Sequence, residues 1–367
     1  MSKETYCEGK IVLTSEKNTL FHAFNGNLQF SAGEKNQWEG EQGNEIGNYE
    51  KMILPNKSEI IKLYHENIVI VASEVHDKKS VNKLMFMAQA IRRVRISSVQ
   101  TVLYFTHGYS SNMIVEFERS LRNYKKNIKI IAITNISELI NYINLGYTKS
   151  FQGDYRNKPD ENGSIYKVNN LYIYSHGMPS RITFMLDWDL YKKNNNIKSL
   201  EDANSNELNL SNYIMLNPDS FSQEATIWSF ACRTGLSVDN DSEIERFTWG
   251  EKESLAQKLA DRINCKTHAF LKRSNYENTW GSKQDRIDLK IADNLEKVNI
   301  YTKKEDKFKE YKRHEIQIDG KYPWQPQGAY HDIKAGDFHL GPPNCMCIFQ
   351  KSKDVIIPCE TMAFPKG

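Results

Sequence analysis

A histidine and a cysteine each end an apolar, strand-like segment of the sequence. His176 stands in YIYSHG and Cys232 in IWSFACRTG. A free thiol is mostly protonated at neutral pH, and an imidazole that takes its proton turns the sulfur into a strong nucleophile. The imidazole can later protonate a leaving amine. The pair is therefore predicted to carry out acyl transfer, with Cys232 as the nucleophile and His176 as the base.

Acyl transfer also needs N–H groups that stabilise the oxyanion of the tetrahedral intermediate. Gly177 lets the backbone approach closely, because glycine has no Cβ. We therefore predict the N–H of Gly177 as one donor and the N–H of Cys232 as the other. A thiol–imidazole pair needs no metal, so no metal or cofactor is expected.

Acidic residues lie in the loops that flank the two segments, near the expected substrate pocket. Asp187, Asp189 and Asp239 are the candidates for substrate binding, because a carboxylate can pair with an Arg or Lys side chain before the scissile bond. The alternative is that they are ordinary solvated carboxylates.

The residues around these positions alternate between strand-like and helix-like patterns. Apolar runs rich in β-branched residues predict buried parallel strands, and apolar residues spaced three or four apart predict helices. The alternation predicts an α/β sheet with helices on both faces. The predicted strands are 67–75, 101–108, 128–134, 170–177, 224–235 and 266–273, and the predicted helices are 80–94, 111–124, 136–146 and 251–263.

The order of the predicted strands brings the two motifs together. In open α/β sheets, functional sites form beyond the carboxyl ends of the strands. The strand ending at His176 directly precedes the strand ending at Cys232, and sequential strands are usually neighbours. His107 also follows an apolar strand and precedes a glycine. Its strand comes two candidate strands earlier, so we expect it further across the sheet.

YSHG followed by SFACRTG resembles the caspase-like (clan CD) superfamily of cysteine peptidases. The similarity covers roughly residues 60–281 and is closest to bacterial CHAT-like domains and the self-processing protease domains of toxins. It implies a three-layer sandwich with a mostly parallel central sheet, His176 as base, Cys232 as nucleophile and Gly177 as oxyanion donor. The cysteine stands in ACRTG and not in the Gln-Ala-Cys of animal caspases, so specificity for aspartate is not implied.

Three regions are expected along the chain. Residues 1–58 read as a small β-rich extension, 59–285 as the peptidase domain, and 286–367 as a C-terminal extension that packs on the domain or follows it. The segment 190–224 is polar and Asn-rich, which predicts a long loop or an insertion. The first region faintly resembles leader segments of type VI secretion effectors. That resemblance implies a bacterial effector or toxin with a secretion-system or immunity partner.

Composition excludes several classes of protein. The net charge is only +3, without a long basic run, so nucleic acid is not expected as a partner. No apolar stretch approaches the length of a membrane span, and the N-terminus lacks the pattern of a signal peptide. We expect a product made in the cytoplasm that leaves the cell, if at all, by a signal-independent route. Six cysteines in 367 residues do not indicate a disulfide framework, so reduced thiols are expected.

Three alternatives compete with the peptidase. THGYSS around His107 resembles the oxyanion strand of α/β-hydrolases, but the G-x-S-x-G elbow that an esterase of that fold needs is missing. The tail residues His331, His339, Cys345 and Cys347 are of types that bind zinc, but their spacing matches no standard finger. The principal rival is a catalytically inactive caspase-like binding or scaffold module. Such a protein usually loses the cysteine or the histidine, whereas this chain has both.

Overall fold

The computed structural model of the chain describes residues 62–75, 83–146, 154–160, 163–186, 206–237, 251–276, 279, 316–336 and 342–359. All of them belong to one unit, Glu59–Gly367. The β-rich extension predicted at 1–58 lies outside the described residues.

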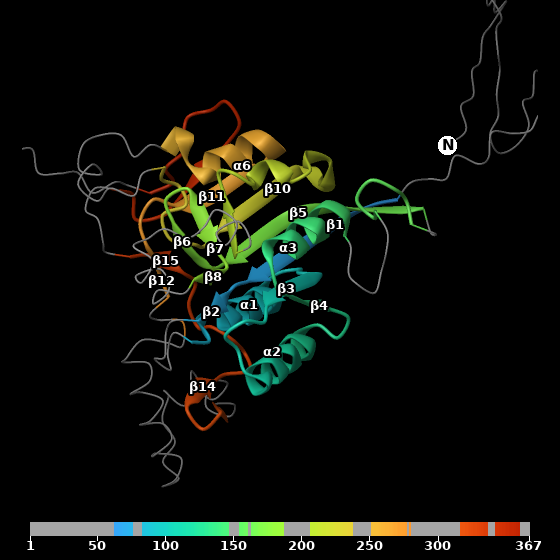
Figure 1. The fold of residues 1–367 in the computed structure, drawn as a ribbon, viewed down its shortest axis with the longest axis vertical. Helices are drawn as coiled ribbons and strands as arrows, with labels where there is room; N and C mark the ends of the chain where they lie inside the picture. The colour runs from blue at the N-terminus through green and yellow to red at the C-terminus, as the bar shows by residue number, and fades with distance from the viewer. Residues whose placement is uncertain are drawn as a thin grey trace, which may run out of the picture. The chain divides into compact units, whose positions relative to one another are not determined.

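A seven-stranded sheet forms the centre of the fold, in the order β16-β11-β10-β5-β1-β3-β4 (Figure 1). Neighbouring strands are parallel except for β16, which is antiparallel to β11. The predicted mixed α/β fold with a mostly parallel sheet is confirmed. The strands are β1 (Lys62–Val71), β3 (Thr101–Phe105), β4 (Lys129–Ile133), β5 (Ser164–Tyr174), β10 (Phe221–Ser229), β11 (Lys266–Phe270) and β16 (Met346–Phe349).

Apolar runs explain why β1 and β5 occupy the middle of the sheet. Residues 68–71 of β1 are fully buried and pair in register with residues 171–174 of β5. A strand covered on both faces gains most from an unbroken β-branched run such as IVIV, because every side chain leaves water.

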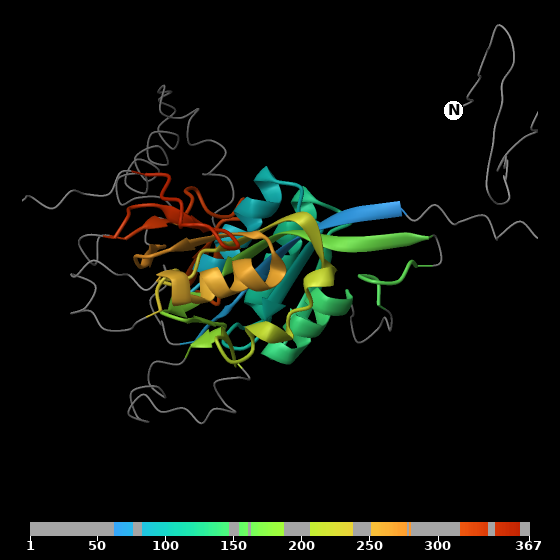
Figure 2. The ribbon, with the colours of Figure 1, turned by 90° about the horizontal axis from the view of Figure 1, so that it is seen from above.

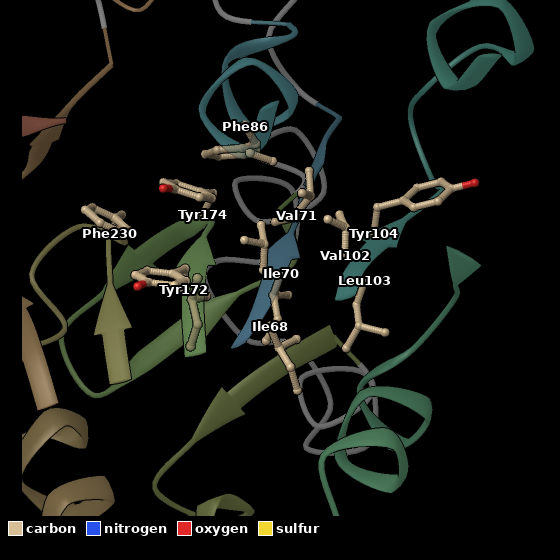
Figure 3. Packing of buried hydrophobic residues seen from close by; sticks show 14 of the residues in the cluster. Ile68, Ile70, Val71, Phe86, Val102, Leu103, Tyr104, Tyr172, Tyr174 and Phe230 are labelled. Carbon is tan, nitrogen blue, oxygen red and sulfur yellow. The ribbon is translucent and has the colours of Figure 1, made fainter. Parts of the chain in front are cut away.

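Helices cover both faces of the sheet. Phe86 of α1 packs over Tyr174 of β5 (Figure 3), and on the opposite face Ala256 and Ala260 of α6 pack with Ala269 of β11. Figure 2 shows α3 and α6 on the same side of the strands. The helices are α1 (Met85–Ile96), α2 (Ser111–Tyr124), α3 (Ile136–Leu145) and α6 (Leu255–Ile263).

Local signals set the helix ends. The hydroxyl of Ser110 accepts a hydrogen bond from the N–H of Met113 at the start of α2, and the side chain of Asn135 does the same at the start of α3. Gly146 ends α3 in the left-handed conformation, with a φ of 70°. The predicted helix 111–124 is therefore confirmed to the residue, and 136–146 to within one residue.

Small sheets surround the carboxyl ends of the central strands. The prediction that all of 190–224 is a loop is wrong for residues 206–224. Leu208 and Leu216 are buried there, so this stretch has apolar anchors, and it forms β9, two 3₁₀ turns and the start of β10. The sheets pair β2 (Ser73–Glu74) with β8 (Met185–Leu186), β12 (Ser274–Asn275) with β15 (Lys334–Ala335), β13 (Ile316–Ile318) with β14 (Tyr322–Trp324), and β6 (His176–Met178) with β7 (Arg181–Thr183) and β9 (Glu207–Asn209).

The C-terminal region contributes to the same structure as the central domain. Its strand β16 extends the central sheet, and β15 pairs with β12. Over the described part of the chain, every helix is too short or too polar to cross a lipid bilayer.

Candidate active site

The ends of β5 and β10 bring the predicted catalytic residues to one edge of the sheet. The two strands are parallel neighbours, with Ile173 opposite Ser229, and the N–H of Phe230 donates to the carbonyl of Ile173 over 3.0 Å. His176 and Cys232 each follow that pair by three residues. The predicted neighbourhood of the two strands is therefore confirmed.

Cys232 lies in a tight turn that is held on the end of β11. The N–H of Arg233 donates to the carbonyl of Lys272 over 3.0 Å, and the N–H of Gly235 donates to the carbonyl of Phe270 over 3.1 Å. Arg233 has a φ of 54°, in the left-handed region that side chains other than glycine seldom adopt. Such a conformation persists where its surroundings fix it, and it is common at functional sites.

Gly177 packs directly on the backbone of Cys232. A Cβ at position 177 would lie 2.6 Å from the carbonyl oxygen and 2.9 Å from the nitrogen of Cys232. It would also lie 2.7 Å from the Cβ of Ala231. Only glycine allows this approach, because real Cβ atoms do not tolerate such contacts.

The hairpin that contains Gly177 leaves its N–H group unused by β7. The two-residue loop between β6 and β7 makes Met178 and Arg181 the closing hydrogen-bonded pair. Gly177 and Ile182 form the next pair, which in an antiparallel ladder is not hydrogen-bonded. The N–H of Gly177 therefore points away from β7, which is the orientation that an oxyanion donor on this strand needs.

The predicted motifs do not include Glu74, the residue that contacts the imidazole. Its Oε2 lies 2.6 Å from Nε2 of His176, and the carboxylate is completely buried. The ring of Phe86 contacts the same imidazole edge to face, with centroids 5.0 Å apart. Glu74 is the second-to-last residue of the apolar run 67–75 and lies in β2, just after β1, which is the other neighbour of β5. Its place at the end of a predicted buried strand is the signal that could have identified it.

Ser274 of β12 contacts the sulfur of Cys232. Its hydroxyl oxygen lies 3.1 Å from Sγ, and its N–H donates to Sγ over 3.3 Å. Among the residues that the structure describes, all hydrogen bonds of this sulfur go to Ser274. The motifs do not predict this contact, because β12 is only two residues long and has no apolar pattern of its own.

His107 lies further across the sheet at its carboxyl edge, as expected. It follows β3, which is separated from β10 by β5 and β1, and its side chain is exposed. The proposed substrate-binding residues Asp187, Asp189 and Asp239 lie outside the described residues.

The tail cysteines correct one expectation. Cys345 and Cys359 form a disulfide, so the expectation of reduced thiols throughout is wrong for this pair. The residues that follow β16 fold back along it, so that Ile348 pairs with Ile356, and this brings Cys345 and Cys359 together. A disulfide-bonded Cys345 cannot serve as a zinc ligand. In the described ranges, no group of three or more His, Cys, Asp or Glu residues is arranged to hold a metal ion, and His339 lies outside them.

The chain was compared with known proteins in three ways, and no family model, curated protein or solved structure matches it.

Proposed function

We propose that the chain is a cysteine endopeptidase with a caspase-like fold, in which Cys232 is the nucleophile and His176 the general base. One observation carries the proposal: the neighbouring parallel strands β5 and β10 are each followed within three residues by one of these two side chains, at one edge of the sheet. The close packing of Gly177 on the backbone of Cys232 supports it, because it brings the backbone of the proposed oxyanion donor against the residue that carries the thiol.

The proposed reaction has two halves. His176 takes the proton of the Cys232 thiol, and the thiolate attacks the carbonyl carbon of the peptide bond. The N–H groups of Gly177 and Cys232 stabilise the oxyanion. When the C–N bond breaks, His176 gives the proton to the leaving amine, and a thioester remains on the sulfur. Water, deprotonated by His176, then attacks the thioester, and the proton returns to the sulfur as the acid product leaves.

Glu74 is the positioning residue of this mechanism. A buried carboxylate is costly unless it is paired, and His176 is a partner that becomes positively charged during the reaction. The bond to Nε2 favours the tautomer that carries its hydrogen on Nε2, and in the proposed reaction Nδ1 is the nitrogen that exchanges the proton with sulfur and amine. The contact with Phe86 limits rotation of the ring.

Two other free cysteines in the described part of the chain provide internal controls. Cys265 and Cys347 are buried, and burial raises the pKa of each thiol to about 12. Thiols with such a pKa react slowly with electrophiles, because the thiolate is the reactive form. Cys232 is partly exposed, so it is expected to react first.

The test combines labelling with cleavage. The purified protein is incubated with a peptide library and with a peptide-based electrophile, and both cleavage sites and labelled cysteines are identified by mass spectrometry. We expect cleavage by the wild type, labelling at Cys232, and loss of both in Cys232→Ala. Cys265→Ala is the matched control and should keep both. A Cys232→Ala variant that cleaves peptides as well as the wild type would refute the proposal. Labelling of Cys232 without any cleavage favours the inactive binding module.

A further inference from the structure

We infer that Ser274 binds the thiolate of Cys232 with two hydrogen-bond donors, its N–H and its hydroxyl. This inference rests on the proposed function in naming Cys232 as the nucleophile. It adds a residue from β12, a strand that contributes neither the base nor the oxyanion donors. The distances to Sγ are 3.3 Å from the nitrogen and 3.1 Å from the hydroxyl oxygen.

The pairing of β12 shows why its backbone faces the sulfur. Arg273 accepts a hydrogen bond from the N–H of Gly336 over 2.7 Å, so these two residues are a hydrogen-bonded pair of the antiparallel ladder. The next pair, Ser274 and Ala335, is therefore not hydrogen-bonded. The N–H and carbonyl of Ser274 point away from β15 and toward Cys232, which agrees with the contacts at the sulfur.

The segment that leads into β15, the pairing partner of β12, is anchored to the body of the domain. Ile333, just before β15, is buried, and Asp332 lies 3.3 Å from the guanidinium of Arg92 in α1. The N–H of Ala329 donates to the carbonyl of Ala88 in the same helix, over 2.8 Å. Ser274 is thus held between an anchored strand and the nucleophile, so its donors are in place before substrate arrives.

Two donors on one sulfur favour the charged form, and both are closer to Sγ than the Ser274 carbonyl, which lies 3.9 Å away and can only accept from the protonated thiol. A serine hydroxyl can rotate to donate or accept, whereas a backbone N–H can only donate. When His176 takes the proton, both groups of Ser274 donate to the sulfur anion, and bonds to a charged group are the stronger kind. Ser274 receives no proton in this step. It stabilises the anion that the base produces.

The experiment measures the rate at which iodoacetamide alkylates Cys232 at pH 7, which needs no peptidase activity. We expect the rate to fall about ten-fold in Ser274→Ala, which corresponds to about 1.4 kcal/mol and is the scale of one hydrogen bond to a charged group. Ser274→Thr keeps both donors and should stay within about two-fold of the wild type. The control is Ser229→Ala. This variant removes a buried hydroxyl at the end of β10, which is hydrogen-bonded to Thr234 in the turn that follows Cys232.

The outcomes separate this inference from the proposed function. An alkylation rate in Ser274→Ala within about two-fold of the wild type overturns the inference, as does an equal fall in Ser229→Ala, which would indicate a structural effect. A wild-type chain that is alkylated at Cys232 but cleaves no peptide refutes the proposed function, while the rates of the variants still decide the role of Ser274.

Discussion

The carboxylate of Glu74 lies 2.6 Å from Nε2 of His176 and is completely buried. The two residues follow neighbouring strands of the central sheet, β1 and β5, and belong to different small sheets, one pairing β2 with β8 and the other β6 with β7. A carboxylate in this position orients the ring. The contact with Glu74 therefore fixes the imidazole from the side of Nε2.

Replacing Glu74 by glutamine tests this relationship. Glu74→Gln keeps the shape of the side chain but removes the charge, and its amide can also favour the wrong ring tautomer. We expect kcat to fall about 100-fold or more, in the range that general acid–base catalysis contributes. Glu118→Gln is the control, because Glu118 bonds to Tyr104 and Arg122 away from this edge. Equal activity in the two variants would contradict the role of Glu74.

The choice between the two strand-end histidines can be tested directly. β3, which precedes His107, lies three strand positions from β10, or about 14 Å at the usual spacing. We therefore expect His176→Ala to lose at least about 100-fold in kcat/KM. His107→Ala should stay close to the wild type. Folding of both variants is checked by circular dichroism. An active His176→Ala beside a dead His107→Ala would require the site to be redrawn around residue 107.

Sequence patterns predict the strands that precede the nucleophile and the base because the carboxyl-terminal halves of both strands place apolar side chains in the core. β5 and β10 contain apolar runs that end abruptly at His176 and Cys232, so the positions of the two residues follow from the pattern and the parallel order. Helix ends such as Ser110 and Gly146 are equally local signals. These parts of the fold depend on residues near one another in the sequence.

The remaining parts of the site depend on contacts between distant residues. Ser274 reaches the sulfur because β12 pairs with β15, some 60 residues later in the chain, and no periodicity links two such short strands. The Cys345–Cys359 disulfide depends on the tail folding back along β16. In the sequence, Glu74 is only a polar residue near the end of an apolar run. Its contact with His176 becomes apparent only when β5 is known to be the neighbour of β1.

The approach of Gly177 to Cys232 gives a third prediction. In Gly177→Ala the added methyl group would overlap the backbone of Cys232. We expect a loss of about 1–3 kcal/mol in stability from overpacking and a large loss of kcat, because the turn of the nucleophile must move. Gly320→Ala is the control. A methyl group at position 320 would meet no atom within 4 Å, but the residue has a φ of 64°. This variant should therefore lose about 1–2 kcal/mol of stability and keep its activity. Full activity in Gly177→Ala would argue against an oxyanion site at this position.

The tail disulfide is expected to contribute to stability. Cys345 and Cys359 are separated by 14 residues, and closing a loop of this size stabilises a protein by about 3 kcal/mol. Cys345→Ser and Cys359→Ser should each show that loss in urea unfolding. A phosphine reductant should lower the wild type to the level of the variants and leave the variants unchanged. If reductant destabilises the variants as much as the wild type, the bond is not the source of the effect.

The buried pair Glu66–Arg156 leads to the last prediction, on acid stability. Nη1 of Arg156 lies 2.6 Å from Oε2 of Glu66, and the hydroxyls of Tyr142 and Thr101 donate to Oε1. Burial by itself raises the pKa of Glu66, but Arg156, Lys129 and the two hydroxyls outweigh it, so the pKa lies below its usual 4.5. The carboxylate of Glu66 therefore binds a proton less readily in the folded state than in the unfolded state.

A carboxylate whose pKa is lowered by folding contributes stability above its unfolded pKa and loses it as the pH falls toward the folded value. Glu66→Gln should cost about 3–5 kcal/mol at pH 7, because it leaves the Arg156 charge buried without its partner. Below about pH 4.5, protonation begins to take the same stabilisation from the wild type, so the difference in unfolding free energy should shrink. Urea unfolding of the wild type and Glu66→Gln at pH 7, 5, 4 and 3 measures this difference in unfolding free energy.

The double variant Glu66→Gln/Arg156→Met is the control. It should recover part of the loss at pH 7, because no unpaired charge remains. A difference between the wild type and Glu66→Gln that stays constant from pH 7 to pH 3 would show that the pair does not carry the linkage.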